Sequence, residues 1–334
     1  MPGSRSTIRP AGWECRTRRH RTLFPYFQVS NLEELRERID DDVEPVELPY
    51  HSPVSNAIYT AFDFSKKGAA PVKERTLTTP GCFEDCDDPS AVEAFPWPNP
   101  EDYISRDECR DVAERAQKGK AVTGILWSAH FQDTCAAFGM ESALMTMLTD
   151  PEMYQAVDAK IVDFYLRANE IFYEAVRGKL HAVLIGNDMG SQQGLMVSPE
   201  LIRRFVIPGA RKLVAQAKSY DLKVIYHSCG AISDIIPDLI EIGVDVVHPI
   251  QALAVGMQPG RLKELYGGRV SFCGGVDAQN LMVSGSPQQV KDTVHELRRL
   301  FPTGLILSPS HEAILPDTKP ENVKALFEAV HEIG

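Results

Sequence analysis

Long apolar runs are missing from this 334-residue sequence, and positive charge is in short supply. No uninterrupted apolar segment approaches the roughly 20 residues that span a bilayer, and no signal peptide opens the chain. With 35 Lys and Arg against 46 Asp and Glu, the formal net charge is −11. Because nucleic acids and anionic membranes attract positively charged surfaces, neither is expected as a partner, although residues 16–21 (RTRRHR) form a local basic cluster.

Cysteine is too sparse for a disulfide framework. The seven cysteines are an odd number in a chain of enzyme-like length, so a reducing, cytoplasmic environment is expected. Cys82 and Cys86 are spaced like two metal ligands, but no second Cys or His pair lies near them in the sequence. Cys273 lies inside an apolar run and is interpreted as a core residue.

The glycine motifs that bind nucleotides are also absent. No GxGxxG or GxxxxGK turn follows any apolar run, which argues against dinucleotide and P-loop sites. The paired carboxylates of barrel glycosidases are not evident either.

From residue 121 onward, apolar runs alternate with amphipathic segments. The runs are AVTGILWS (121–128), HAVLIGNDMG (181–190), KVIYHSCG (223–230), VDVVHPI (244–250), RVSFCGGVD (269–277) and GLILSPSH (304–311). They lack polar alternation, as is typical of parallel strands buried on both faces. The segments 198–220, 286–301 and 319–333 each open with a Pro start signal and are helical in pattern. This series of βα units predicts an α/β fold of the TIM-type (β/α)₈ barrel class.

The N-terminal third is less regular, and its strands are atypical. FPYFQV (24–29) and VEPVELPY (43–50) are interpreted as the first two strands, NLEELRERI (31–39) as the helix between them, and VKERTLTTPG (72–81) as a hairpin. Residues 1–30 are expected to be an irregular segment, and residues 31–334 a single barrel domain.

Polar residues gather where the predicted strands end, which is where barrel enzymes place their sites. His227 and Cys229 follow the KVIY run, and side chains two residues apart on a strand point the same way. Other strand ends contribute Trp127, His130, Asp188, Gln193, His248, Asp277 and His311. We expect one pocket to collect them.

His227 and Cys229 are therefore candidates to share a metal. Catalytic zinc takes imidazole and thiolate ligands, usually three from the protein with one open position, and His311 is the predicted third ligand. The alternative is that Cys229 packs as a small buried residue and His227 donates a hydrogen bond. The residues alone leave both interpretations open.

Four stretches, in the right order, resemble the uroporphyrinogen decarboxylase superfamily, which includes cobalamin-dependent methyltransferases. They are GNDMGSQQGLMVSPELIRRFVIP (186–208), HSCGAISDIIPDLIEIGVDVVHPIQ (227–251), FCGGVDAQ (272–279) and SPSHEAILPDTKPENVKALFEA (308–329). The resemblance spans roughly residues 121 to 334 and implies a TIM-type barrel.

The methyltransferase branch is the more similar one. Its H-x-C motif, matched by His227 and Cys229, supplies zinc ligands, with a further cysteine near the C-terminus whose position falls on His311 here. Histidine in place of cysteine at this position can still bind zinc. The decarboxylases carry an N-terminal RQAGRY loop, of which RPAGWE (9–14) keeps only part. The strand ends also lack the Lys and Arg that a polyanionic porphyrinogen needs.

The resemblance implies a zinc-dependent methyltransferase that moves a methyl group between a small methylated substrate or thiol and a corrinoid carried by a partner protein. Asp188 and His311 are the predicted catalytic residues, and Asp188 is also a further ligand or a hydrogen-bond partner of a ligand. The predicted substrate contacts are Trp127, His130, Gln193, His248 and Asp277. The alternatives are a decarboxylase acting on a tetrapyrrole or another carboxylated substrate, and a non-catalytic barrel that binds a small ligand.

Overall fold

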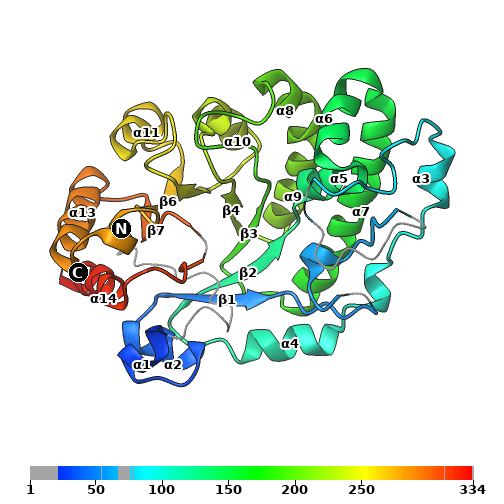
Figure 1. Ribbon diagram of the computed structural model, residues 1–334. Helices are drawn as coiled ribbons and strands as arrows, with labels where there is room; N and C mark the ends of the chain where they lie inside the picture. The colour runs from blue at the N-terminus through cyan, green and yellow to red at the C-terminus, as the bar shows by residue number, and fades with distance from the viewer. Residues whose placement is uncertain (1–21, 54, 67–75, 77, 312, 333–334) are drawn as a thin grey trace.

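A computed structural model describes residues 22–53, 55–66, 76, 78–311 and 313–332. Within them, seven parallel strands form one sheet in the order β1 to β7. The strands are β1 (Val43–Glu47), β2 (Ala121–Trp127), β3 (Ala182–Gly186), β4 (Lys223–His227), β5 (Val246–Ile250), β6 (Ser271–Val276) and β7 (Leu305–Pro309). Figure 1 shows this sheet curled, with helices outside it. The fold is the predicted TIM-type α/β barrel, although the described residues supply seven strands and include no pairing of β7 with β1.

The strands have the two buried faces that their apolar runs predict. One face packs against the helices, and the other points into the barrel, where Val43, Ile125, Leu184 and Ile225 form a separate small core. Because side chains alternate along a strand, this inward row continues toward the carboxyl ends of the strands. Cys273 is fully buried in β6, as predicted.

Helices follow the strands along the chain and cover the sheet. They are α3 (Ser90–Ala94), α4 (Arg106–Glu114), α5 (His130–Phe138), α6 (Met140–Thr149), α7 (Pro151–Ala175), α8 (Pro199–Phe205), α9 (Ile207–Ser219), α10 (Ile236–Glu241), α11 (Pro259–Tyr266), α12 (Leu281–Ser284), α13 (Pro287–Leu300) and α14 (Pro320–Glu332). Short 3₁₀ turns occupy Ile58–Thr60, Pro100–Asp102 and Ser233–Ile235. No helix in the described part of the chain is both long enough and apolar enough to cross a membrane.

The start signals read from the sequence are real helix caps. Ser198 accepts a hydrogen bond from the Leu201 N–H at the start of α8, and Ser286 forms a full capping box with Gln289 at the start of α13. The segment 198–220 divides into α8 and α9 at Val206. Pro208 is the second residue of α9, and because proline lacks an N–H it is best tolerated in the first turn of a new helix.

The N-terminal strand prediction was half wrong. Residues Leu23–Phe27 form the helix α1 rather than a strand, α2 (Leu32–Ile39) follows as predicted, and the second predicted strand is β1. Pro25 explains the error, because a proline breaks a strand's hydrogen-bond ladder but costs little near a helix start. Half of the predicted hairpin, residues 72–75 and 77, and the whole RPAGWE stretch lie outside the described residues. The domain boundary near residue 30 stays a prediction.

Candidate functional site

Strand register brings the predicted site residues together at the carboxyl ends of β3, β4 and β5. Ile225 lies in the barrel's inner core, and His227, two residues on, shares its face. His227 pairs in register with Gly186 of β3 on one side and with His248 of β5 on the other. Side chains from three strands therefore converge on one point.

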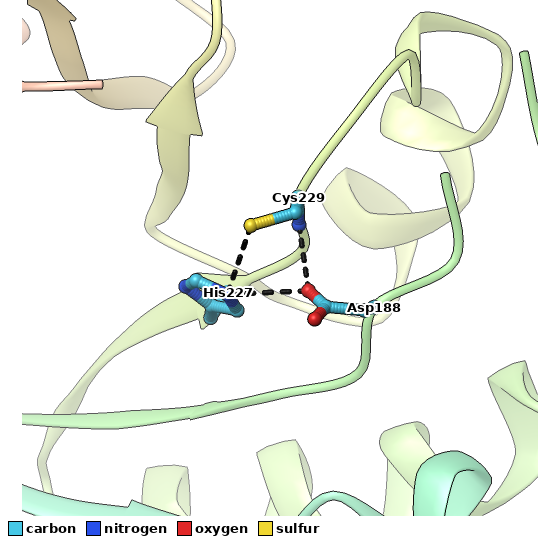
Figure 2. Close-up of side chains that lie close together, drawn as sticks. All are labelled: Asp188, His227 and Cys229. Atoms are coloured by element: carbon cyan, nitrogen blue, oxygen red, sulfur yellow. Dashed lines mark hydrogen bonds and ion pairs between the residues drawn. The ribbon is translucent and has the colours of Figure 1, made fainter. Parts of the chain in front are cut away.

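Asp188, His227 and Cys229 form a cluster at this point (Figure 2). The His227 Nε2 atom lies 3.2 Å from Asp188 Oδ1 and 3.6 Å from Cys229 Sγ. The backbone N–H of Cys229 donates to the same Asp188 oxygen at 2.8 Å. All three potential ligand atoms lie within 4.8 Å of one another.

The spacing of these atoms fits zinc. In a tetrahedral site with bonds of about 2.0–2.1 Å to N and O and about 2.3 Å to S, the N···O edge is about 3.3 Å and the N···S edge about 3.6 Å. The two edges at His227 Nε2, 3.2 Å to Asp188 Oδ1 and 3.6 Å to Cys229 Sγ, match these values, and the third edge, between Asp188 and Cys229, is no longer than 4.8 Å. The donor set of one carboxylate, one imidazole and one thiol is also a zinc set. Asp188, His227 and Cys229 thus offer three potential ligands of the kinds that zinc takes.

Burial and hydrogen bonding have opposite effects on the pKa values of Asp188 and His227, and the hydrogen bonds together have the larger effect. Burial would raise the pKa of Asp188, but the hydrogen bonds to His227 and Cys229 outweigh it and lower the pKa to about 2. Burial would likewise lower the pKa of His227, but its bonds with Asp188 and Cys229 hold that pKa well above its usual range. Without metal, the pair is therefore a carboxylate beside an imidazolium.

His248 supports the far side of the His227 ring. The two Nδ1 atoms lie 2.9 Å apart, and His248 is fully buried. Burial, reinforced by the charges of His227 and His311, holds the pKa of His248 well below its usual value. Neutral His248 accepts the Nδ1–H bond of His227, and Nε2 of His227 then faces Asp188 and Cys229. The structure thus places His248 behind a ligand, while the predicted substrate contact stays a prediction.

Trp127 lies against the same histidine from the end of β2. Its ring meets the His227 ring edge-on, with centroids 5.4 Å apart. Trp127 and Ser128 both have positive φ, at 59° and 52°, a conformation that is uncommon for residues other than glycine and clusters at functional sites. The buried Ser128–Asn169 hydrogen bond helps to hold this turn.

Other predicted site residues lie beside the cluster rather than in it. His311 and Asp277 line a pocket of about 190 Å³ at the carboxyl ends of the later strands. His311 accepts a hydrogen bond from the Ala313 N–H through Nδ1, and it is not among the three clustered ligands found in the described residues. Its predicted roles as ligand and catalytic residue remain predictions.

His130 and Gln193 lie apart from the other residues that were predicted to contact the substrate. His130 is fully buried between α5 and α7, with Nδ1 2.7 Å from Asp158 Oδ1. Gln193 is exposed, whereas its neighbour Gln192 donates to Gln251 beside the cluster. No periodicity distinguishes adjacent residues of a loop, so no sequence signal favours Gln192 over Gln193. Cys82 and Cys86 belong to no metal-binding cluster in the part of the chain that is described.

Comparison with known proteins places this geometry in context. The profile of the uroporphyrinogen decarboxylase (URO-D) family matches residues 57–333. A methylated-thiol–coenzyme M methyltransferase from Methanosarcina mazei is 26% identical over 230 residues, which cover 65% of this chain and 59% of that protein. A uroporphyrinogen decarboxylase from Myxococcus xanthus is 34% identical over 143 residues, covering 42% of this chain and 38% of that one.

Among solved structures, a methyltransferase from Methanosarcina mazei superimposes with a TM-score of 0.56 at 19% identity. The match covers 68% of this chain and 63% of that chain. At this identity the likeness bears on the fold alone. The chain spans less than two thirds of the length of each of these three proteins.

Proposed function

The chain belongs to the uroporphyrinogen decarboxylase (URO-D) family, and from this premise we propose that it is a zinc-dependent methyltransferase. It moves a methyl group between a small methylated substrate or thiol and a corrinoid cofactor held by a partner protein. The geometry of Asp188, His227 and Cys229 is the observation that carries this proposal. The methyltransferase from Methanosarcina mazei, which matches more of this chain than the decarboxylase does, supports the choice of reaction.

The reaction is a displacement at a methyl carbon. The bond from the methyl carbon to the donor atom breaks as the bond to the acceptor forms, and the electron pair of the broken bond stays with the donor atom. Zinc, when bound, supplies Lewis acidity that lowers the pKa of a coordinated thiol and so makes a thiolate available.

The chain's own residues prepare this step. Asp188, already ionised, and Cys229 present their ligand atoms on one side of the His227 ring. His248 holds the other side, so the ring cannot rotate away. The Trp127 ring packs edge-on against His227 and so places an apolar surface beside the site.

A decarboxylase is the second candidate, favoured by the 34% identity to the enzyme from Myxococcus xanthus. Such an enzyme has to bind carboxylates, which calls for cationic side chains. The described lining of the pocket beside the cluster contains no Lys or Arg, and His311 is the basic side chain in it. Release of CO₂ from uroporphyrinogen, with unchanged activity after removal of metal, would favour this second candidate.

The test of the proposal is metal content together with methyl transfer. We expect about one zinc per chain in purified wild-type protein, loss of zinc in Cys229→Ala, and retention in Cys273→Ala, which removes a buried thiol away from the cluster. Methyl transfer is followed by the visible spectrum of methylcobalamin with 2-mercaptoethanol as the thiol. Wild-type protein that takes up no zinc on reconstitution would contradict the proposal and leave a substrate contact or simple packing for His227 and Cys229.

A further inference from the structure

The pocket beside the metal cluster has a polar wall whose described lining contains His311 but no lysine or arginine. Its volume is about 190 Å³, and its lining comes from the segments after β3, β5, β6 and β7. Gln251 ties this pocket to the cluster, because its Oε1 accepts the N–H of Gly230, which follows Cys229, at 2.8 Å. Gln251 thus links the wall of the pocket to the loop that carries Cys229.

Two glutamines in this wall present complementary groups. Gln251 Oε1 also accepts a hydrogen bond from Gln192 Nε2 at 3.1 Å, so both bonds fix the orientation of the two amides. Among the described residues, neither Gln251 Nε2 nor Gln192 Oε1 has a hydrogen-bond partner. The pair thus offers a ligand one N–H donor group and one carbonyl acceptor.

Asp277 is the acidic side chain in the described lining of the pocket. The Asp277 carboxylate is held at the wall by backbone N–H bonds from Gln279, Asn280 and Leu281. No Lys or Arg is present in the described lining to balance it, and the whole chain carries a net charge of −11. An anionic ligand at this wall would be desolvated beside the Asp277 carboxylate with no Lys or Arg to offset the repulsion, which is unfavourable.

We infer that the small molecule that gives or receives the methyl group is uncharged and polar, and that the amides of Gln192 and Gln251 hold it through one donor and one acceptor. This inference rests on methyl transfer at the neighbouring cluster. It adds a charge class for the substrate and assigns specificity to Gln192 and Gln251.

The test compares two methyl thioethers of the same shape, (methylthio)acetamide and the (methylthio)acetate anion. Their binding to the zinc-loaded protein is measured by calorimetric titration. We expect the amide to bind roughly tenfold or more tightly than the carboxylate. Gln251→Leu removes the N–H donor and should weaken amide binding by roughly tenfold. Gln279→Lys adds a cation to the exposed rim of the pocket and should bring carboxylate binding up to or above that of the amide.

Three outcomes overturn the inference. These are tighter binding of the carboxylate by wild-type protein, binding of neither compound, and no response of either affinity to Gln279→Lys. Because the readout is binding, it is separate from zinc content and methylcobalamin turnover. A protein that retains zinc and turnover but prefers the carboxylate would contradict only the substrate class, whereas loss of zinc and turnover would contradict the proposed function.

Discussion

His227 on β4 and His248 on β5 stand side by side, with their Nδ1 atoms 2.9 Å apart. The pairing follows from strand register, which sets the two residues directly opposite each other. Because a histidine bound to metal through one nitrogen is oriented by the partner of its other nitrogen, His248 is expected to control how well His227 binds zinc.

Replacing His248 tests this relationship. His248→Leu removes the acceptor for the His227 Nδ1–H, and zinc affinity should fall by roughly 10- to 100-fold. Competition with a chelator of known zinc affinity measures the change. His248→Gln supplies a side-chain oxygen that can accept the same bond and should recover much of the affinity. Equal affinities for wild type and His248→Leu would show that the contact is packing alone.

Asp188 is expected to act as a ligand through its charge. Asp188→Asn keeps an oxygen for the Cys229 N–H bond but replaces a carboxylate with a neutral amide, a much weaker zinc donor. We expect at least a roughly tenfold loss of zinc affinity by calorimetry. Asp277→Asn, the same change at the end of β6 outside the cluster, should leave affinity unchanged. If both variants bind zinc like the wild type, the third ligand is another residue, and His311 becomes the one to replace.

Gly230 is predicted to be indispensable to the loop that carries Cys229. Its φ is +88°, and an added Cβ would lie 2.4 Å from the backbone of Gly190. Gly230→Ala should therefore lower both the free energy of unfolding and the zinc affinity. Gly268 has a similar φ of +81° but open space around it, so Gly268→Ala isolates the backbone strain of roughly 1–2 kcal/mol. Urea denaturation should show the larger loss for Gly230→Ala, and equal losses would mean that the contact with Gly190 is easily relieved.

Asp133 on α5 should make stability depend on pH. Burial raises the pKa of its carboxyl to about 7, only partly offset by the hydrogen bond from Tyr165. Because the folded-state pKa lies above the unfolded value, this contribution to stability is full below about pH 4, declines as the pH rises, and is lost above about pH 7. The total change is roughly 4 kcal/mol.

Asp133→Asn removes the titrating group, so the pH dependence of its unfolding free energy should be flatter than that of the wild type between pH 4 and 7. Denaturant unfolding across this range measures the difference. Asp163→Asn replaces an exposed carboxylate on α7 and should keep the wild-type slope. Parallel curves for wild type and Asp133→Asn would show that Asp133 ionises within the folded protein at little cost.

Much of the fold could be predicted because its signals are local. The six apolar runs after residue 121 became β2 to β7, since parallel strands buried on both faces must be apolar along their whole length. The caps at Ser198 and Ser286 likewise depend only on neighbouring residues. Leu23–Phe27 was mistaken for strand because a short apolar run has no period long enough to distinguish strand from helix.

The sequence by itself predicted that His227 and Cys229 lie on the same side, because side chains alternate along extended backbone; in the structure β4 ends at His227, and Cys229 still lies beside it. Only the tertiary structure decided which other residues lie beside His227 and Cys229. The register of β3 against β4, with Gly186 opposite His227, brings Asp188 into the cluster, and the register of β4 against β5 brings in His248. His311 is left beside the neighbouring pocket. Pairing between strands distant in the chain depends on how the whole barrel closes its core, and no local pattern of residues records it.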